Sequence, residues 1–236
     1  VEEPPPESPS QGGLRFEKLQ MRYRSELPFV LNGISFEVQP GHKVGICGRT
    51  GSGKSSLLVA LWRLCEPTAG SIWLDGIDIS TISLKRLRSS ITCIPQDPVL
   101  FSGTIRYNLD PFNEYTDEKL WYVLEHVKCK DFIGKQGLGL DAPVEEFGGN
   151  YSAGQRQMLC LARAMLRDTK VVCLDEATAS VDTETDDNMQ KVIATEFVNC
   201  TISRLKMTDA HKGHTLMESN QHIGKILLLN SKEIPE

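Results

Sequence analysis

The glycine-rich stretch "GRTGSGKS", Gly48 to Ser55, constrains the fold more than any other part of the chain. It follows the short apolar segment 42–48 and precedes 54–65, where leucines and Trp62 fall along one face of an expected helix. Glycines let a backbone wrap closely around an anion, so that successive N–H groups and the start of the helix point at phosphate oxygens. The strand–loop–helix order therefore predicts a nucleotide site, where glycines alone would also allow an ordinary turn.

The side chains of this stretch suit a bound triphosphate and its metal ion. Lys54 adds a formal charge at the β- and γ-phosphates, and the Ser55 hydroxyl can ligate Mg²⁺. The nucleotide-binding residues predicted here form one run: Gly48, Arg49, Thr50, Gly51, Ser52, Gly53, Lys54, Ser55 and Ser56.

Two carboxylates follow a buried strand late in the chain. The segment "KVVCLDEA" (170–177) is apolar until it reaches Asp175 and Glu176. A carboxylate at a strand end suits a metal held beside phosphate, and the next one could orient or deprotonate an attacking water. On its own, such a strand end is usually no more than a solvated terminus. Beside a phosphate loop, Asp175 is predicted to ligate magnesium and Glu176 to act as the catalytic base.

Strand and helix patterns alternate along the rest of the chain. Strands are expected where apolar and polar residues alternate, and helices where apolar residues recur along one face. The expected strands include 14–23, 34–39, 70–79 and 89–96, and the expected helices include 117–127 and 152–166. Residues 103–150 carry helical patterns and little strand signal. The interleaved elements predict an α/β core with a helical insertion.

Composition excludes several functions and sets the domain limits. With 236 residues, of which 40% are apolar and 24% charged, the chain has the make-up of one ordinary globular domain. A net charge of −5 argues against general nucleic-acid binding, and the seven scattered cysteines lack the spacing of a zinc or disulfide framework. The acidic, proline-rich residues 1–13 predict a linker before a domain at 14–236, so we expect this domain to be joined to more protein.

Two motifs carry a family resemblance. The stretch "YSAGQRQ" (151–157), followed closely by "VVCLDEATASVD" (171–182), resembles the nucleotide-binding domain of ATP-binding-cassette (ABC) transporters. The phosphate loop alone also fits many GTPases and kinases, whereas the glycine–glutamine signature helix does not. The resemblance, from about residue 14 to 202, implies a P-loop NTPase core of α/β class. Its parts are a mostly parallel sheet, an antiparallel β subdomain and an inserted α-helical subdomain at about 103–168.

The resemblance assigns roles outside the phosphate loop. Tyr23 matches the aromatic residue that stacks on adenine, although a lone strand tyrosine is more often simple packing. Gln96 in "IPQDP" matches the glutamine that reaches Mg²⁺ and the catalytic water, with a polar strand end as the alternative. The implied metal ligands are thus Ser55, Gln96 and Asp175.

The signature residues are implied to serve a second domain. Ser152, Gly154 and Gln155 match the motif that caps the γ-phosphate of ATP held by a partner, a second helix N-terminus offered to an anion. Ser180 and Asp182 match the loop that crosses the interface between two such domains.

Finer features resemble one subfamily. The stretches "FSGTIRYNLDPF" (101–112) and "GLDAPVEEFGGNYSAGQRQ" (139–157) look like the second nucleotide-binding domain of C-subfamily, multidrug-resistance-associated exporters. In those proteins the two composite sites are unequal, and the second domain supplies the catalytic glutamate while its own signature departs from the usual one. Here Glu176 is present, while Tyr151 and Ala153 replace leucine and glycine.

The segment from about residue 203 is atypical. In "ISRLKMTD" the charges of Arg204, Lys206 and Asp209 interrupt what should be a buried apolar strand, so we expect the segment to bulge out or stay disordered. Matching "DAHKGHTLMESN" (209–220) to the family makes His211 the histidine that contacts the γ-phosphate. Its displaced position leaves two alternatives: His211 reaches the phosphate from a loop, or it lies outside the site. "GKILLLNSKEI" then resembles the last strand.

The resemblance implies an ATPase motor of a membrane exporter. Its partners would be a second nucleotide-binding domain, paired head to tail, and transmembrane domains elsewhere in the protein, with no nucleic acid. The domain would lie at the cytoplasmic face of a membrane as part of an integral membrane transporter. The displaced histidine favours an alternative, a regulatory module that binds ATP and dimerises without efficient hydrolysis, and Glu176 opposes it.

Overall fold

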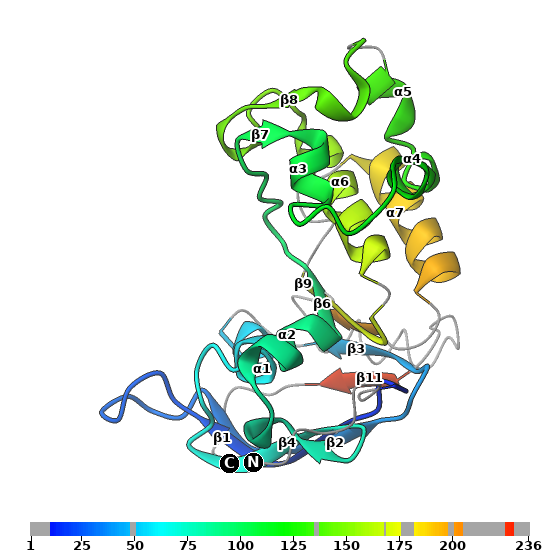
Figure 1. The fold of residues 1–236 in the computed structure, drawn as a ribbon. Helices are drawn as coiled ribbons and strands as arrows, with labels where there is room; N and C mark the ends of the chain where they lie inside the picture. The colour runs from blue at the N-terminus through cyan, green and yellow to red at the C-terminus, as the bar shows by residue number, and fades with distance from the viewer. Residues whose placement is uncertain are drawn as a thin grey trace. The chain divides into compact units, whose positions relative to one another are not determined.

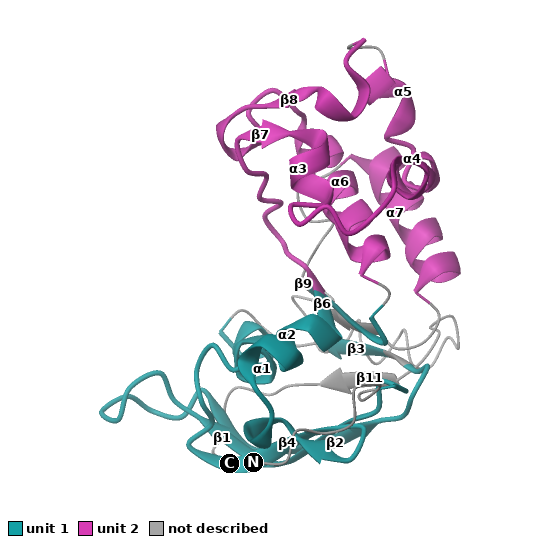
Figure 2. Ribbon diagram, viewed as in Figure 1, with its two compact units in different colours: residues 1–92, 169–176, 199–236 teal, residues 93–168, 177–198 magenta. Residues whose placement is uncertain are grey.

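The computed structural model describes residues 10–47, 51–134, 137–167, 169–175, 182–197, 201–204 and 225–228. For the last two segments and for Lys43, Cys47 and Asp175 it describes the backbone. The chain divides into two compact units, residues 1–92, 169–176 and 199–236 (unit 1) and residues 93–168 and 177–198 (unit 2) (Figure 2). Each unit has its own secondary structure.

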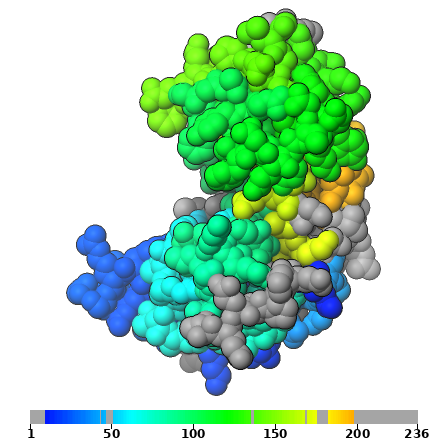
Figure 3. Space-filling model, in the orientation of Figure 1, coloured from blue at the N-terminus to red at the C-terminus, as the bar shows by residue number. Residues whose placement is uncertain are grey.

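Unit 1 contains an antiparallel four-stranded sheet in the order β2-β1-β4-β5. These strands are β1 (Leu14–Met21), β2 (Leu31–Val38), β4 (Ala69–Leu74) and β5 (Ile77–Asp78) (Figure 1). In β1, Leu14 and Phe16 are buried, as are Leu19 and Met21; each pair follows the period of two, and an irregularity in register between the pairs shifts the alternation by one residue. Phe16 stacks on Phe36 of the neighbouring strand, with ring centroids 4.3 Å apart. The loop between β1 and β2 stands out from unit 1 (blue in Figure 3).

A second sheet in the order β11-β3-β10-β9-β6 carries the expected phosphate loop. Its strands are β3 (Lys43–Cys47), β6 (Ile91–Ile94), β9 (Val171–Asp175), β10 (Thr201–Arg204) and β11 (Lys225–Leu228). β10 runs parallel to both β3 and β9, and β11 runs parallel to β3. The expected last strand is therefore confirmed as β11, at one edge of this sheet.

The expectation that the segment 202–209 bulges out or stays disordered is wrong for residues 202–204. They belong to β10 (Thr201–Arg204), which lies between β3 and β9 in the sheet. Arg204 is the last residue of the strand, so its charge falls at the strand end and not in the middle of the buried run. Lys206, Asp209 and His211 lie outside the described residues.

Two helices complete the described part of unit 1: α1 (Lys54–Leu61) and α2 (Leu84–Ser90), the second preceded by a 3₁₀ turn, η1 (Ile79–Thr81). Leu57 and Leu61 of α1 and Leu87 of α2 are buried in the same apolar cluster as β1 and β3. Arg88 donates from Nε to the Trp62 carbonyl (3.2 Å) and from Nη2 to the Arg63 carbonyl (3.1 Å). These bonds satisfy carbonyl groups at the end of α1 that the helix itself leaves without a partner.

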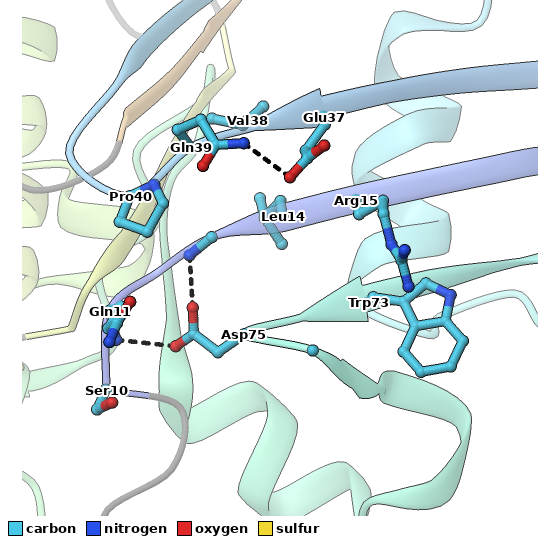
Figure 4. A pocket seen from close by; sticks show the side chains of 12 residues that line it. Ser10, Gln11, Leu14, Arg15, Glu37, Val38, Gln39, Pro40, Trp73 and Asp75 are labelled. Carbon is cyan, nitrogen blue, oxygen red and sulfur yellow. Dashed lines mark hydrogen bonds between the residues drawn. The ribbon is translucent and has the colours of Figure 1, made fainter.

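The last residues of the expected linker are tied to unit 1 at Asp75. Its carboxylate accepts the backbone N–H of Gln11 (2.8 Å) and of Gly13 (2.6 Å) (Figure 4). The same region holds the Arg15 guanidinium 4.9 Å from the ring centroid of Trp73. The chain is therefore fastened to the antiparallel sheet just before β1 begins.

Unit 2 is mostly helical and is organised around α6 (Ala153–Leu166), which packs against three other helices. These are α3 (Ile105–Leu109), α4 (Asp117–His126) and α7 (Thr183–Glu196). The unit also contains α5 (Lys130–Gly134), the strand pair β7 (Gly103–Thr104) and β8 (Pro143–Val144), and the 3₁₀ turns η2 (Gly139–Asp141) and η3 (Glu146–Gly148). Among the described residues, no helix is both long and apolar enough to cross a membrane.

Candidate nucleotide site

The backbone before α1 requires glycine. Gly51 and Gly53 have φ angles of 82° and 91°, in the left-handed region that residues with a Cβ rarely adopt. A Cβ on Gly53 would lie 2.7 Å from the Val30 carbonyl oxygen, so close packing excludes a side chain there as well. A Cβ on Gly51 would meet no atom of the described residues within 4 Å.

The start of α1 lacks the side-chain cap that most helices have. Its N-cap residue, Gly53, offers no side-chain acceptor to the first N–H groups of the helix. The Ser52 hydroxyl is buried, 5% exposed, and has no hydrogen-bond partner within the described part of the chain. Lys54 is also buried, at 6% exposure. Uncapped N–H groups, the positive end of a helix dipole, an orphaned hydroxyl and a lysine together fit a bound phosphate.

Asp175 is the last residue of β9, at the carboxyl ends of the parallel strands, and the loop leaves β3 at the same end of the sheet. The backbone of Arg204 in β10 is level with Ile46 of β3 on one side and with Asp175 of β9 on the other. Strands in a sheet lie about 4.8 Å apart, so the ends of β3 and β9 are separated by roughly 10 Å. Ser55, in the first turn of α1, is exposed. A serine in this helix turn and an aspartate at this strand end are residue types that would suit the all-oxygen coordination of Mg²⁺.

Tyr23 is anchored to the helix of the phosphate loop. Its hydroxyl lies 2.9 Å from Oγ of Ser56, and the residue is 51% exposed. The hydrogen bond fixes the position of the ring while leaving much of its surface open. The Ser56 hydroxyl is engaged with Tyr23, so Ser56 can contribute to an anion site through its backbone N–H.

Gln96 belongs to unit 2, whereas the phosphate loop belongs to unit 1. It is partly buried and lies two residues after the end of β6. The carbonyl of the preceding residue, Pro95, accepts a hydrogen bond from Nε2 of Gln157 (2.9 Å).

Ser152 and Gln155 cap α6 reciprocally. Ser152 Oγ accepts from the Gln155 N–H (3.1 Å), and Gln155 Oε1 accepts from the Ser152 N–H (3.0 Å). Both bonds leave donors for another group, because the Ser152 hydroxyl proton and the Gln155 amide NH₂ do not take part in them.

Gly154 lies against the first turn of α7. A Cβ at this position would be 3.0 Å from Oγ1 and 3.1 Å from Cγ2 of Thr185. Asp182 caps α7: its carboxylate accepts from the Thr185 N–H (2.9 Å) and from the Thr185 hydroxyl (2.8 Å). These hydrogen bonds, the backbone one above all, lower the pKa of the exposed Asp182 carboxyl. The starts of α6 and α7 are thus neighbours.

Several predicted site residues lie outside the described parts of the chain. They are Gly48, Arg49, Thr50, Glu176, Ser180 and His211.

Three polar residues of unit 2 were missed as site candidates: Asn108, Gln157 and Arg163. Gln157 is fully buried on α6, and the Arg163 guanidinium donates to backbone carbonyls outside its helix. A signal was present in the sequence, because Arg163 interrupts the apolar run that begins directly after Gln157 in "QMLCLARAML" (157–166). Polar residues at such positions need specific partners.

Comparisons with known proteins agree with this geometry. The family described as "ABC transporter" matches residues 31–179. The chain is 49% identical over 233 residues to ATP-binding cassette sub-family C member 2 of Homo sapiens, and 50% identical over 233 residues to ABC transporter C family member 3 of Dictyostelium discoideum. Each alignment covers 99% of this chain, which spans only 15% and 16% of the two relatives.

A solved structure is also similar. The structure of a bacterial Atm1-family ABC exporter with ATP bound matches with a TM-score of 0.83 and 28% identity. The match covers 96% of this chain and 38% of that chain. This likeness confirms the predicted P-loop NTPase fold of α/β class.

Proposed function

Because the chain belongs to the ABC transporter family, we propose that it is the ATP-binding and ATP-hydrolysing motor domain of a membrane exporter. The observation that carries the proposal is the uncapped start of α1, with its left-handed glycines and orphaned Ser52 hydroxyl, at the same sheet edge as Asp175. An anion with several oxygens would satisfy the N–H groups and the hydroxyl, and a cation bound beside that anion would suit Asp175.

Each residue near the phosphates has a role in this proposal. The N–H groups of the loop and Lys54 hold the β- and γ-phosphates, while Ser55, Asp175 and Gln96 hold Mg²⁺. When bound, Mg²⁺ neutralises charge on the phosphate oxygens. Tyr23, fixed by its bond to Ser56, offers a ring face to adenine.

Hydrolysis needs a base and a positioned water. Glu176 takes a proton from water as the water oxygen attacks the γ-phosphorus, and the bond from phosphorus to the oxygen of the β-phosphate breaks. The products are ADP and phosphate. His211 would contact the γ-phosphate in the same step.

The capped start of α6 serves a second nucleotide-binding domain. Ser152, Gly154 and Gln155 present free donors and a helix dipole to the γ-phosphate of ATP held by that partner, which pairs head to tail with this domain. The likeness to C-subfamily relatives supports a place in an exporter of that type, as its second such domain. Transmembrane domains elsewhere in the same protein would be driven by closure and hydrolysis, with this domain at the cytoplasmic face.

The test is Mg²⁺-dependent ATP hydrolysis by the intact protein that contains this chain. Glu176→Gln should lower kcat about 100-fold or more while ATP binding remains, because the general base alone is lost. The matched control is Glu118→Gln, a carboxylate in the exposed first turn of α4. ATP binding by the wild-type protein without measurable turnover would favour the regulatory module and contradict the motor.

A further inference from the structure

We propose that Gln157 and Arg163 of α6 are positioning residues that hold Gln96 in place by gripping both ends of its loop. This loop, Pro95–Phe101, is the glutamine loop. The inference rests on the proposed function, because it concerns the turnover in which Gln96 takes part.

The first grip is at the start of the glutamine loop. Nε2 of Gln157 donates to the Pro95 carbonyl, immediately before Gln96, at 2.9 Å. Gln157 is fully buried, so solvent has little access to compete for this hydrogen bond. A shift of the Pro95 peptide would change the direction in which the chain enters Gln96.

The second grip is at the far end of the loop. Nη1 of Arg163 donates to the Val99 carbonyl (2.7 Å), while its Nε donates to the Asn108 carbonyl (2.6 Å). Asn108 extends the grip, because its side chain accepts the Phe101 N–H (2.8 Å) and donates to the Phe101 carbonyl (2.7 Å). Gln157 and Arg163 stand roughly 9 Å apart along the axis of α6, so one rigid helix holds both ends of the loop.

Two apolar side chains of the glutamine loop are exposed. Leu100 is buried, whereas Val99 and Phe101 are exposed, Phe101 by 61%. The Arg163 guanidinium lies 5.9 Å from the ring centroid of Phe101. The backbone is therefore fixed from the α6 side while these apolar side chains remain outside, and the position of Gln96 is coupled to that of the helix that carries Ser152 and Gln155.

A buried glutamine at position 157 lowers stability relative to an apolar residue of similar size. Its Oε1 is buried and has no hydrogen-bond partner within the described part of the chain. A buried amide that is only half satisfied is less stable than an apolar side chain of similar size. The amide is therefore explained better by the hydrogen bond to Pro95 than by packing.

The test is a double-mutant cycle on steady-state ATPase activity of the intact protein. Gln157→Leu should lower kcat about five- to tenfold, with the KM for ATP changed less than twofold and the melting temperature unchanged or raised. In a Gln96→Ala background the same change should lower kcat less than twofold, because the residue through which it acts is gone. The Mg²⁺ concentration for half-maximal activity should rise in Gln157→Leu and remain at the Gln96→Ala value in the double variant.

Arg163→Lys provides a second variant, and Arg88→Lys is its matched control. Both arginines donate to two backbone carbonyls, but Arg88 does so at the end of α1 in unit 1. We expect a loss of kcat that depends on Gln96 for Arg163→Lys, and none for Arg88→Lys. Equal losses in the presence and absence of Gln96, for both Gln157→Leu and Arg163→Lys, would overturn the inference and leave the motor function standing. Absence of turnover in the wild-type protein would overturn the proposed function itself, and the inference with it.

Discussion

The starts of α1 and α6 are built in opposite ways. α1 follows a left-handed glycine, has no side-chain cap and lies beside a buried hydroxyl without a partner in the described residues. α6 begins with Ser152 and Gln155, which satisfy each other's backbone N–H groups. The start of α1 is thus left without a side-chain cap, where we propose that a ligand binds, whereas the start of α6 is capped by side chains of its own chain.

This contrast indicates that the two helix starts have different roles, although both suit an anion. A side-chain N-cap stabilises a helix by about 1 kcal/mol, and α1 has no such cap. A ligand present at 100 times its dissociation constant stabilises the folded state by about 2.7 kcal/mol. The stability of the start of α1 should therefore depend on bound nucleotide. The start of α6 needs no such contribution, which suits a surface presented ready-made to ATP held by another domain.

The largest expected effect on stability comes from a substitution in the loop before α1. Gly53→Ala forces a Cβ into a left-handed conformation and against the Val30 carbonyl, so we expect a loss of about 2 kcal/mol or more in unfolding free energy. Urea unfolding of the isolated chain measures it. The control is Gly51→Ala, which has the same backbone strain but open space around its Cβ and should cost less. Equal losses would mean that close packing at Gly53 is unimportant.

Lys54→Ala should have the second-largest effect, a loss of ATP affinity. Charge-assisted hydrogen bonds contribute about 1.5–3 kcal/mol, so ATP affinity should fall roughly tenfold to 100-fold. Equilibrium binding of a fluorescent ATP analogue measures the change. Lys85→Ala, at an exposed lysine of α2, is the matched control and should bind normally. Unchanged ATP affinity after Lys54→Ala would contradict the placement of the phosphate site at the start of α1.

Ser152→Ala should separate the two helix starts. Loss of the cap should lower the unfolding free energy of the chain by about 1 kcal/mol, while ATP binding by its own phosphate loop stays unchanged. Chemical unfolding and nucleotide titration of the same preparation measure both quantities. A large loss of ATP affinity would show that the α6 start is not independent of the site at α1.

The smallest effect is a pH dependence at the neighbouring helix α7. Asp182 has its pKa lowered below the ordinary value of 3.8 by the backbone and side chain of Thr185. Its folded-state pKa lies below its unfolded one, so its contribution is present above about pH 4 and is lost as pH falls through the folded value. Unfolding measured from pH 6 down to pH 2 should show a shallower decline in Asp182→Asn than in the wild-type chain. Identical slopes would rule out this contribution.

The parts that sequence predicted well are those with short-range signals. The strand–loop–helix around Lys54 and the amphipathic α6 are visible in consecutive residues, and the structure has both. The bonds from Tyr23 to Ser56 and from Gln157 to Pro95 join residues far apart in the chain, and no periodicity encodes them. The expectation for residues 202–204 is wrong because Arg204 is the last residue of β10 and does not interrupt the strand.

The most direct test of the account is hydrogen exchange at the two helix starts, in the isolated chain at a dilution where it is monomeric. Adding a non-hydrolysable ATP analogue with Mg²⁺ at about 100 times its dissociation constant should slow exchange of the first amides of α1, Lys54 to Ser56, by roughly 100-fold. The first amides of α6, Ala153 to Gln155, should not change. Equal protection of both helix starts, or none at α1, would contradict the assignment of the uncapped start of α1 as the site that holds the triphosphate.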